Sequence, residues 1–335
     1  MGEQQQVRGL SLMSGGLDSQ LAICVLQRAG AYMEAVCFET PFFTADKARA
    51  AAAALGVKLH VVDFTDDEIE LIKNPPHGFG GAMNPCIDCH ATMIRRAGEL
   101  MRELGFDFVS TGEVLNQRPM SQNRQSLGIV ARDSGLEGRL VRPLSAQLLD
   151  PSVPEQEGRL DRTKLLALQG RRREPQVQLA AEFGLTDYPS PAGGCKLTEE
   201  GFSNRLRDLM EHESLDERRL VRLLSRGRRF RLPEGASVIL GRNGEENAVL
   251  AKRRIATDVM LEPVGASGPT ALIPAPKVPL AQADLARAQV IVAAWSRDDG
   301  SGRELSVRMT RGETVTTVPV PQPYDRTAFM AYQLR

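Results

Sequence analysis

Six residues near the N-terminus constrain the fold of this chain more than any other part of its sequence. They read Ser14, Gly15, Gly16, Leu17, Asp18 and Ser19, and they join an apolar segment, 7–13, to a segment of helical pattern, 17–28. Glycines let the backbone approach an anion closely, Ser14 and Ser19 add hydroxyl donors, and the first turn of the helix presents free N–H groups. We therefore predict a phosphate-binding loop, with an ordinary glycine turn as the alternative.

Asp18 has a separate expected role in this loop. A carboxylate is a poor phosphate ligand, so we expect Asp18 to orient the loop or to hold Mg2+. The loop also lacks the Gly-Lys-Ser/Thr sequence of a Walker A motif. It resembles instead the SGGxDS signature of PP-loop ATP pyrophosphatases, and the resemblance implies that ATP is cleaved between its α and β phosphates.

The first part of the chain alternates between predicted strands and helices. The strands are 7–13, 32–38, 57–62 and 106–111, and the helices are 17–28, 45–55 and 89–104. This alternation predicts an α/β fold with a doubly wound, mainly parallel sheet. Ligands of such sheets bind at the carboxyl ends of the strands, where the loops 14–19, 38–44 and 111–114 would meet. Phe38 and Gly112 are therefore nucleotide-binding candidates alongside the phosphate loop.

The character of the sequence changes after about residue 150. We expect a PP-loop catalytic domain over 1–190, connecting helices over 191–229, and an α+β domain over 230–335. Short strands are predicted at 237–240, 247–250, 305–309 and 314–320, with one helix at 281–294. This arrangement predicts a second, smaller domain.

Composition restricts the cellular setting and the kinds of partner. The 335 residues carry no formal net charge, which argues against nucleic-acid binding by bulk charge alone. No stretch approaches the roughly 18 apolar residues of a membrane span, and the N-terminus lacks the pattern of a signal peptide. We expect a cytoplasmic protein without membrane contact, where disulfides are uncommon.

The five cysteines fall into two groups. Cys24 and Cys37 lie inside a predicted helix and strand and are expected to be small core residues. Cys86 and Cys89 lie where a turn runs into a helix, a place that lowers the pKa of a thiol, and Cys195 follows a glycine pair.

Three thiolates favour a [4Fe–4S] cluster with one iron left open, if Cys195 folds onto the other two. Two alternatives remain. One is a Zn2+ site with His90 as the fourth ligand, and the other is a disulfide or persulfide relay. The three cysteines and Asp18 are the catalytic candidates.

Several motifs together resemble the catalytic domain of tRNA 4-thiouridine synthetases and related tRNA thiolation enzymes. They are the phosphate loop, residues 84–90, residues 111–122 and residues 142–144. The resemblance covers about the first 210 residues. It implies adenylation of a tRNA uridine by ATP, followed by sulfur insertion, with sulfide or a cysteine desulfurase as the sulfur donor. A homodimer is compatible with the sequence.

The C-terminal part resembles a second family, and several features of the chain differ from the 4-thiouridine synthetases. Residues 230–320 resemble the RNA-binding domain named after NFACT proteins. The phosphate loop begins at residue 14, so we expect no THUMP domain before it, and we expect no C-terminal rhodanese domain. Asn116 stands where a glycine is usual. The three-cysteine relatives use an iron–sulfur cluster, and this chain resembles that subtype.

Two basic runs favour RNA as a partner. The first run contains Arg159, Arg162, Lys164, Arg171, Arg172 and Arg173. The second run contains Arg218, Arg219, Arg222, Arg226, Arg228, Arg229 and Arg231. On a continuous helix, Arg218, Arg222 and Arg229 would share one face and could bind phosphates. The alternative is a solvated face paired with nearby glutamates.

Two other functions stay open at this stage. One is a PP-loop sulfur transferase or amidating enzyme that acts on a small molecule, and the other is a non-catalytic RNA-binding protein. The intact phosphate loop argues against the second of these.

Overall fold

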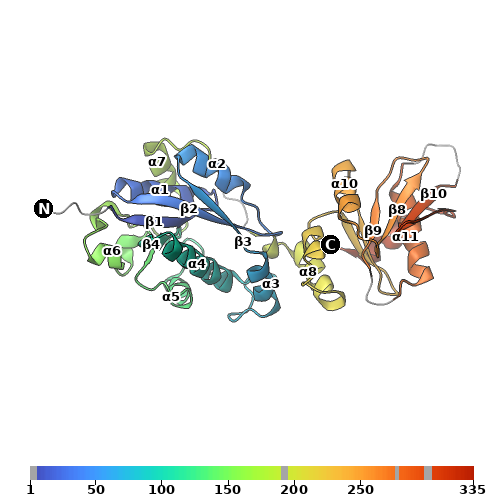
Figure 1. The fold of residues 1–335 in the computed structure, drawn as a ribbon, viewed down its shortest axis with the longest axis horizontal. Coiled ribbons are helices and arrows are strands. Elements are labelled where there is room, and N and C mark those ends of the chain that lie inside the picture. Colours follow the sequence, from blue (N-terminus) through green and yellow to red (C-terminus); the bar gives the residue numbers. More distant parts are fainter. Residues whose placement is uncertain (1–5, 190–194, 276–278, 298–303) are drawn as a thin grey trace. The chain divides into compact units, whose positions relative to one another are not determined.

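The computed structural model describes residues 6–189, 195–275, 279–297 and 304–335 (Figure 1). The chain divides into two compact units, Met1–Thr198 and Glu199–Arg335. Within the described ranges, no helix is long and apolar enough to cross a membrane. Cys195 belongs to the first unit.

The first unit is built on a sheet of five parallel strands. In spatial order they are β3 (Leu59–Asp63), β2 (Tyr32–Glu39), β1 (Arg8–Leu12), β4 (Phe108–Ser110) and β5 (Leu140–Val141). The doubly wound parallel sheet predicted from the sequence is therefore confirmed. The direction of winding reverses between β1 and β4, and ligands of such sheets bind beside that reversal.

Helices cover both faces of this sheet (Figure 1). One face carries α1 (Leu17–Arg28), α2 (Asp46–Leu55) and α7 (Glu174–Glu182), and the other carries α3 (Thr65–Lys73), α4 (Cys86–Glu103) and α5 (Arg124–Asp133). Short helical segments complete the unit: η1 (Ala146–Leu148), α6 (Val153–Gln156), η2 (Arg162–Lys164) and η3 (Lys196–Thr198). Alternate residues of β2 supply the two cores, with Ala35 and Cys37 on the first face and Val36 and Phe38 on the second.

Helix α1 carries the phosphate loop at its start and is held firmly by the core. Its residues Leu17, Leu21 and Val25, spaced four apart, are 1% exposed or less. Arg28 lies in the last turn, where a positive charge favours the helix dipole. The helix spans the residues that its periodicity predicted, so the loop before it has a fixed anchor.

The second unit contains a seven-stranded antiparallel sheet. Its spatial order is β11 (Thr314–Pro319), β10 (Ser306–Arg311), β8 (Val259–Val264), β9 (Ala271–Ile273), β7 (Ser237–Leu240), β6 (Arg228–Arg231) and β12 (Gln333–Leu334). Its helices are α8 (Glu200–His212), α9 (Arg218–Leu223), α10 (Gly244–Arg253), α11 (Gln282–Trp295) and η4 (Thr327–Tyr332). Ile291 and Val292 of α11 pack with Val238, Leu261 and Val307 of the sheet.

The strand predicted at 247–250 is wrong, because these residues lie in α10. Asn243 caps this helix, and its side-chain oxygen accepts a hydrogen bond from the backbone N–H of Glu246 at 2.9 Å. Acidic residues then occupy the first turn and basic residues the last, as helix electrostatics favours. The Asn-x-x-Glu spacing of residues 243–246 is a helix-start signal in the sequence. This signal is stronger evidence for a helix than the short apolar run is for a strand.

The predicted helical face of Arg218, Arg222 and Arg229 is also wrong. Helix α9 ends at Leu223, and Arg229 lies in strand β6 with only 1% of its surface exposed. Burial lowers the pKa of Arg229 to about 10. Because this side chain is enclosed, it cannot contact RNA phosphates.

Other arginines of the same run are held in ion pairs. Arg231 donates to Asp208 at 2.7 Å and to Glu213 at 2.8 Å. Arg219 donates to Asp258 at 2.6 Å and to Glu217 at 2.6 Å. The positive charges of these two side chains are therefore largely neutralised by carboxylates of the second unit.

Candidate active site

The phosphate loop lies at the carboxyl end of β1, beside the reversal of winding. Gly16 precedes the first turn of α1 with an extended backbone and makes no side-chain cap. The hydroxyl of Ser19 donates to the carbonyl of Gly16 at 2.8 Å, and the hydroxyl of Ser14 accepts from the backbone N–H of Gly16 at 3.3 Å. The loop is thus closed by its own serines, while the helix start offers the N–H groups that an anion requires.

Gly15 explains why this loop needs glycine. Its φ of +78° lies in the left-handed region, and an added Cβ would lie 2.4 Å from the backbone carbon of Lys47. The amide of Gln20 donates to the Gly15 carbonyl at 3.1 Å and fixes it from the side of the helix. The conformation of the loop is therefore set by its surroundings before any ligand arrives.

Gly112 brings the segment after β4 against the loop. An added Cβ there would lie 2.5 Å from the backbone carbon of Asp18 and 2.6 Å from the backbone nitrogen of Ser19. The side-chain amide of Gln117 donates to Asp18 Oδ2 at 3.0 Å. Burial raises the pKa of Asp18, while this hydrogen bond and the charges of Arg173 and Arg118 act in the opposite direction.

Phe38 takes a structural position at this edge. Its ring is 5% exposed and packs against Phe64, with ring centroids 5.3 Å apart. The side chain belongs to the core beneath the site, so it offers little ring surface to a nucleotide base. Any nucleotide contact of Phe38 would use its backbone.

Cys86 and Cys89 both lie in the first turn of α4, which begins three residues earlier than predicted. Cys86 is partly exposed, whereas Cys89 is 7% exposed. The thiol of Cys89 donates to Glu68 Oε2 at 3.1 Å. Glu68 is fully buried, and burial raises its pKa to about 7.

Cys195 approaches the other two thiols. The backbone N–H of Met83 donates to the carbonyl of Leu197 at 3.1 Å, which joins the segment of Cys195 to the turn before α4. Burial and Glu68 raise the pKa of Cys89, and the neighbouring Cys195 and Cys86 act in the same direction. The structure therefore brings the three predicted cysteines into one neighbourhood.

The thiols of Cys86, Cys89 and Cys195 can be compared with the ligand sets of metal and cluster sites. The donor set fits iron or zinc in kind, because three thiols and a carboxyl group lie close together. In the described part of the chain, however, no three His, Cys, Asp or Glu side chains are arranged to hold a single metal ion.

The expected lowering of thiol pKa at the start of α4 is wrong. Burial raises the pKa of Cys86, and it raises the pKa of Cys89 well above the usual range with help from Glu68. Desolvation of the thiolate outweighs the favourable helix end. Both cysteines are therefore protonated thiols at neutral pH until a ligand displaces the proton.

Cys24 lies in α1, and Cys37 belongs to the first core. They are 7% and 5% exposed, and burial raises the pKa of Cys37 to about 11. Their burial agrees with the packing role expected for them.

A buried carboxylate connects three of the sequence motifs. Glu113 accepts hydrogen bonds from Arg142 at 2.8 Å and from Thr111 at 3.0 Å, and its other oxygen lies 3.3 Å from Nδ1 of His90. Arg142 and His90 together hold the pKa of Glu113 at about 2, against the opposing effect of burial. The contacts of Glu113 with Arg142 and His90 therefore connect the segment after β4 to the end of β5 and to α4.

We expect Glu113→Gln to destabilise the first unit by about 3 kcal/mol at pH 7, because it leaves the Arg142 guanidinium buried and unpaired. The pKa of Glu113 is lowered from 4.5 to about 2 on folding, so its stabilisation is complete above pH 4.5 and is lost as the pH falls towards 2. Urea unfolding at several pH values measures this difference.

The exposed Glu137 gives the matched control, since Glu137→Gln should change the free energy of unfolding by less than about 0.5 kcal/mol. A Glu113→Gln deficit that stayed constant from pH 7 to pH 3 would contradict the electrostatic role.

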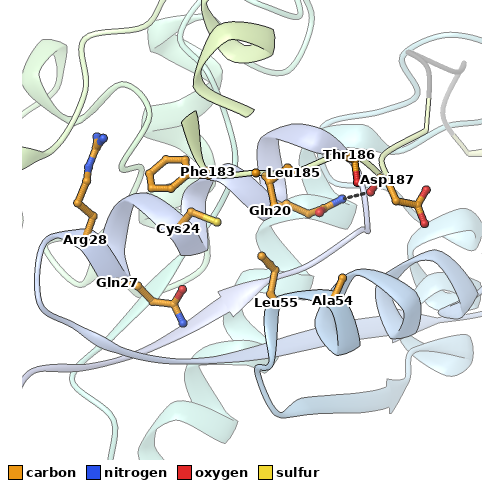
Figure 2. A pocket seen from close by; sticks show the side chains of 11 residues that line it. Gln20, Cys24, Gln27, Arg28, Ala54, Leu55, Phe183, Leu185, Thr186 and Asp187 are labelled. Atoms are coloured by element: carbon orange, nitrogen blue, oxygen red, sulfur yellow. Dashed lines mark hydrogen bonds between the residues drawn. The ribbon is translucent and has the colours of Figure 1, made fainter. Parts of the chain in front are cut away.

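A cavity of about 470 Å³ lies on another side of α1 (Figure 2). It is lined by Gln20 and Cys24 of α1, by Ala54 and Leu55 of α2, and by residues 183–187 after α7. Figure 2 shows Gln20 directed towards the backbone of Asp187, to whose carbonyl it donates at 3.4 Å. The cavity touches none of residues 14–19, so it is separate from the phosphate loop.

Glu68 was not recognised from the sequence, although a signal was present. Thr65, Glu68, Ile69 and Ile72 follow helical spacing and form the buried face of α3. A carboxylate among them is placed in the core. Glu113 and Arg142 lay within recognised motifs, but their pairing depends on a contact between residues 29 apart in the chain.

Residues 4–147 match the family model of the thiamine biosynthesis protein ThiI. The first unit therefore carries a ThiI-type PP-loop domain, and residues 227–328 match the model of the NFACT protein RNA binding domain. Both family resemblances drawn from the sequence are confirmed.

Individual relatives extend the match of the ThiI-type domain. A probable tRNA sulfurtransferase from Caldanaerobacter subterraneus subsp. tengcongensis is 32% identical over 142 residues, covering 40% of this chain and 35% of the relative. The tRNA-specific 2-thiouridylase MnmA of Sulfurimonas denitrificans is 31% identical over 115 residues, covering 31% of this chain and 33% of the relative. The chain thus spans about a third of the length of these curated relatives.

A solved 4-thiouridine synthetase in complex with RNA and bound ATP is 20% identical. The match covers 53% of this chain and 52% of that chain, with a TM-score of 0.36.

Proposed function

We propose that this protein is an ATP-dependent sulfurtransferase that adenylates a uridine of tRNA and replaces its carbonyl oxygen with sulfur. One observation carries the proposal: the phosphate loop and three thiols lie in the same unit and are electrostatically linked. The charge of Arg118 acts both on Asp18 beside the loop and on Cys86 beside the thiols. The tRNA sulfurtransferase names of the relatives support the same reaction class.

The proposed chemistry has two balanced steps. The uridine carbonyl oxygen attacks the α-phosphorus of ATP, a P–O bond breaks, and pyrophosphate leaves. Hydrosulfide or an equivalent sulfur nucleophile then attacks the activated carbon. The C–O bond breaks, AMP leaves with the original oxygen, and the proton of the sulfur is released as the C=S bond forms.

The residues of the first unit would divide these steps between them. The loop of residues 14–19 binds the triphosphate, and Arg118 steadies the negative charge that passes from phosphate to AMP. Lys196 stands next to Cys195 in the sequence and is a second candidate for that role. The thiols of Cys86, Cys89 and Cys195 serve the sulfur half of the reaction.

A [4Fe–4S] cluster on these three cysteines is the form of the sulfur site that we propose. When bound, such a cluster supplies an open iron that can take an inorganic sulfur ligand. Sulfide or a cysteine desulfurase is the proposed sulfur donor. The odd number of thiols supports this form, whereas a closed zinc site would use four protein ligands.

The second unit is proposed to hold the tRNA. Its match to an RNA-binding domain supports this role. Within the arginine run, Arg218 and Arg222 on α9 are exposed and can face phosphates, in contrast to Arg229. Neutralised phosphates release counterions, so binding should weaken as salt rises.

The decisive experiment supplies purified protein, reconstituted with iron and sulfide under anaerobic conditions, with ATP, Mg2+, sulfide and unmodified tRNA. Mass spectrometry of the digested nucleosides should then detect a thiouridine that depends on ATP. ATP cleavage to AMP that is stimulated by a small molecule, with no thiolated nucleoside, would instead favour the small-molecule sulfur transferase or amidating enzyme.

Ser14→Ala and Asp18→Ala should each lower AMP formation by about 100-fold or more. Ser14 closes the loop, and Asp18 faces the segment after β4. Both substitutions remove polar groups at a loop edge, so the thermal unfolding transition should persist. Wild-type AMP formation by either variant would remove residues 14–19 from the ATP site.

A further inference from the structure

Two buried oxygen atoms beside the phosphate loop have no hydrogen-bond partner among the described residues. They are Oδ1 of Asp18 and Oε1 of Gln117. The two side chains touch, because the Gln117 amide nitrogen donates to the other Asp18 oxygen at 3.0 Å. A buried oxygen without a hydrogen-bond partner is unfavourable, so the pair is unfavourable without a ligand.

The orientation of the Gln117 amide follows from this contact. A carboxylate oxygen only accepts hydrogen bonds, so the amide must turn its NH2 group towards Asp18. Its oxygen then points away from that hydrogen bond. The unpaired oxygen is therefore a consequence of the Asp18 contact and is not an arbitrary choice of amide orientation.

The backbone places Gln117 at the loop. Gly112 allows the segment after β4 to lie against Asp18 and Ser19 without a clash. Asn116 then adopts a φ of +61°, a left-handed conformation that asparagine tolerates better than most residues. The backbone N–H of Gln117 is held by the carbonyl of Val114 at 3.1 Å. The presence of Asn116 at a position where glycine is usual is explained by this turn.

The chemistry of the two oxygens identifies their ligand. A carboxylate and an amide oxygen are ligands that Mg2+ takes, and Mg2+ in nucleotide sites commonly uses one or two protein oxygens together with phosphates and water. We propose that Gln117 and Asp18 together hold the divalent cation of the ATP triphosphate. This inference rests on the proposed function, since it assumes that residues 14–19 bind ATP.

Equilibrium binding tests this role without using turnover. Isothermal titration with a non-cleavable α,β-methylene ATP should show tighter binding in Mg2+ than in EDTA for the wild-type protein. Gln117→Met keeps the length of the side chain but removes both its donor and its acceptor. In this variant the increase in nucleotide affinity caused by Mg2+ should be about tenfold smaller than in the wild-type protein. Removal of groups around a metal typically has an effect of this size. Binding in EDTA should stay at the wild-type level.

Gln178→Met, at an exposed position of α7, is the matched control and should keep the full Mg2+ dependence. An undiminished Mg2+ gain in Gln117→Met would overturn the inference. Equal weakening in Mg2+ and in EDTA would also overturn it, since it would assign Gln117 a purely structural role. Failure of the wild-type protein to bind the nucleotide would instead count against the proposed function.

Discussion

Gly112→Ala should reduce AMP formation by about 100-fold or more while both units stay folded. The added Cβ would lie 2.5 Å from the backbone carbon of Asp18, 2.6 Å from its oxygen and 2.6 Å from the nitrogen of Ser19. These are backbone atoms, so they cannot rotate away as the end of a side chain can. The phosphate loop must shift, and a displacement of about 1 Å in a catalytic site costs about 100-fold in rate.

The matched control is Gly128→Ala in α5. An added Cβ there meets no atom within 4 Å, and alanine favours a helix over glycine by about 0.5–1 kcal/mol. Gly128→Ala should therefore retain full AMP formation and unfold at a slightly higher temperature. Near-normal turnover by Gly112→Ala would mean that the close contact between the segment after β4 and the loop is not needed for catalysis.

The part of the site that is built from residues adjacent in the chain could be predicted from the sequence. The strand, the glycine loop and helix α1 follow one another directly, and α1 spans residues Leu17–Arg28 as its periodicity predicted. Local glycine geometry and helical spacing determine this segment. A doubly wound, mainly parallel sheet could also be predicted, because strands and helices alternate. The short strand β5 was not predicted.

Contacts between distant residues could not be read in the same way. The hydrogen bond from Gln117 to Asp18 joins residues 99 apart, and no local pattern encodes it. The approach of Cys195 to Cys89 was an assumption at the level of sequence, and the backbone link between Met83 and Leu197 now supports it. Burial raises the pKa values of Cys86 and Cys89, although the sequence predicted that they are lowered. This burial likewise depends on the completed fold.

The wrong prediction for the arginine run came from extending one helical pattern too far. The arginine run was treated as a continuous helix, but Gly227 has a φ of +68° and an added Cβ would lie 2.6 Å from the carbonyl oxygen of Leu240. Helix α9 ends at Leu223, and Gly227 lies directly before the first residue of β6. Glycine is a helix breaker that the sequence shows, and Arg229 lies beyond it in a strand whose two central residues are buried.

The cysteine variants should separate the three forms of sulfur chemistry. Alanine at Cys86, Cys89 or Cys195 should each sharply lower the iron content of anaerobically reconstituted protein, because a cluster with three protein ligands needs all of them. Thiouridine formation should fall by about 100-fold or more in each variant. AMP formation should partly survive, since it uses the phosphate loop. Metal analysis, absorbance near 400 nm and nucleoside mass spectrometry measure the three effects.

Cys24→Ala and Cys37→Ala are the matched controls, because Cys24 is a buried residue of α1 and Cys37 a buried residue of β2. Both should keep iron and thiolation, with only a small loss of stability from the lost packing. A persulfide relay would give little iron in any protein and lose sulfur transfer at the carrier cysteine alone. Zinc would give metal without colour, and His90→Ala would then release it. Full iron retention in Cys195→Ala would contradict the three-cysteine site even if Cys86 and Cys89 proved essential, because the third thiol would then lie near the cluster without holding it.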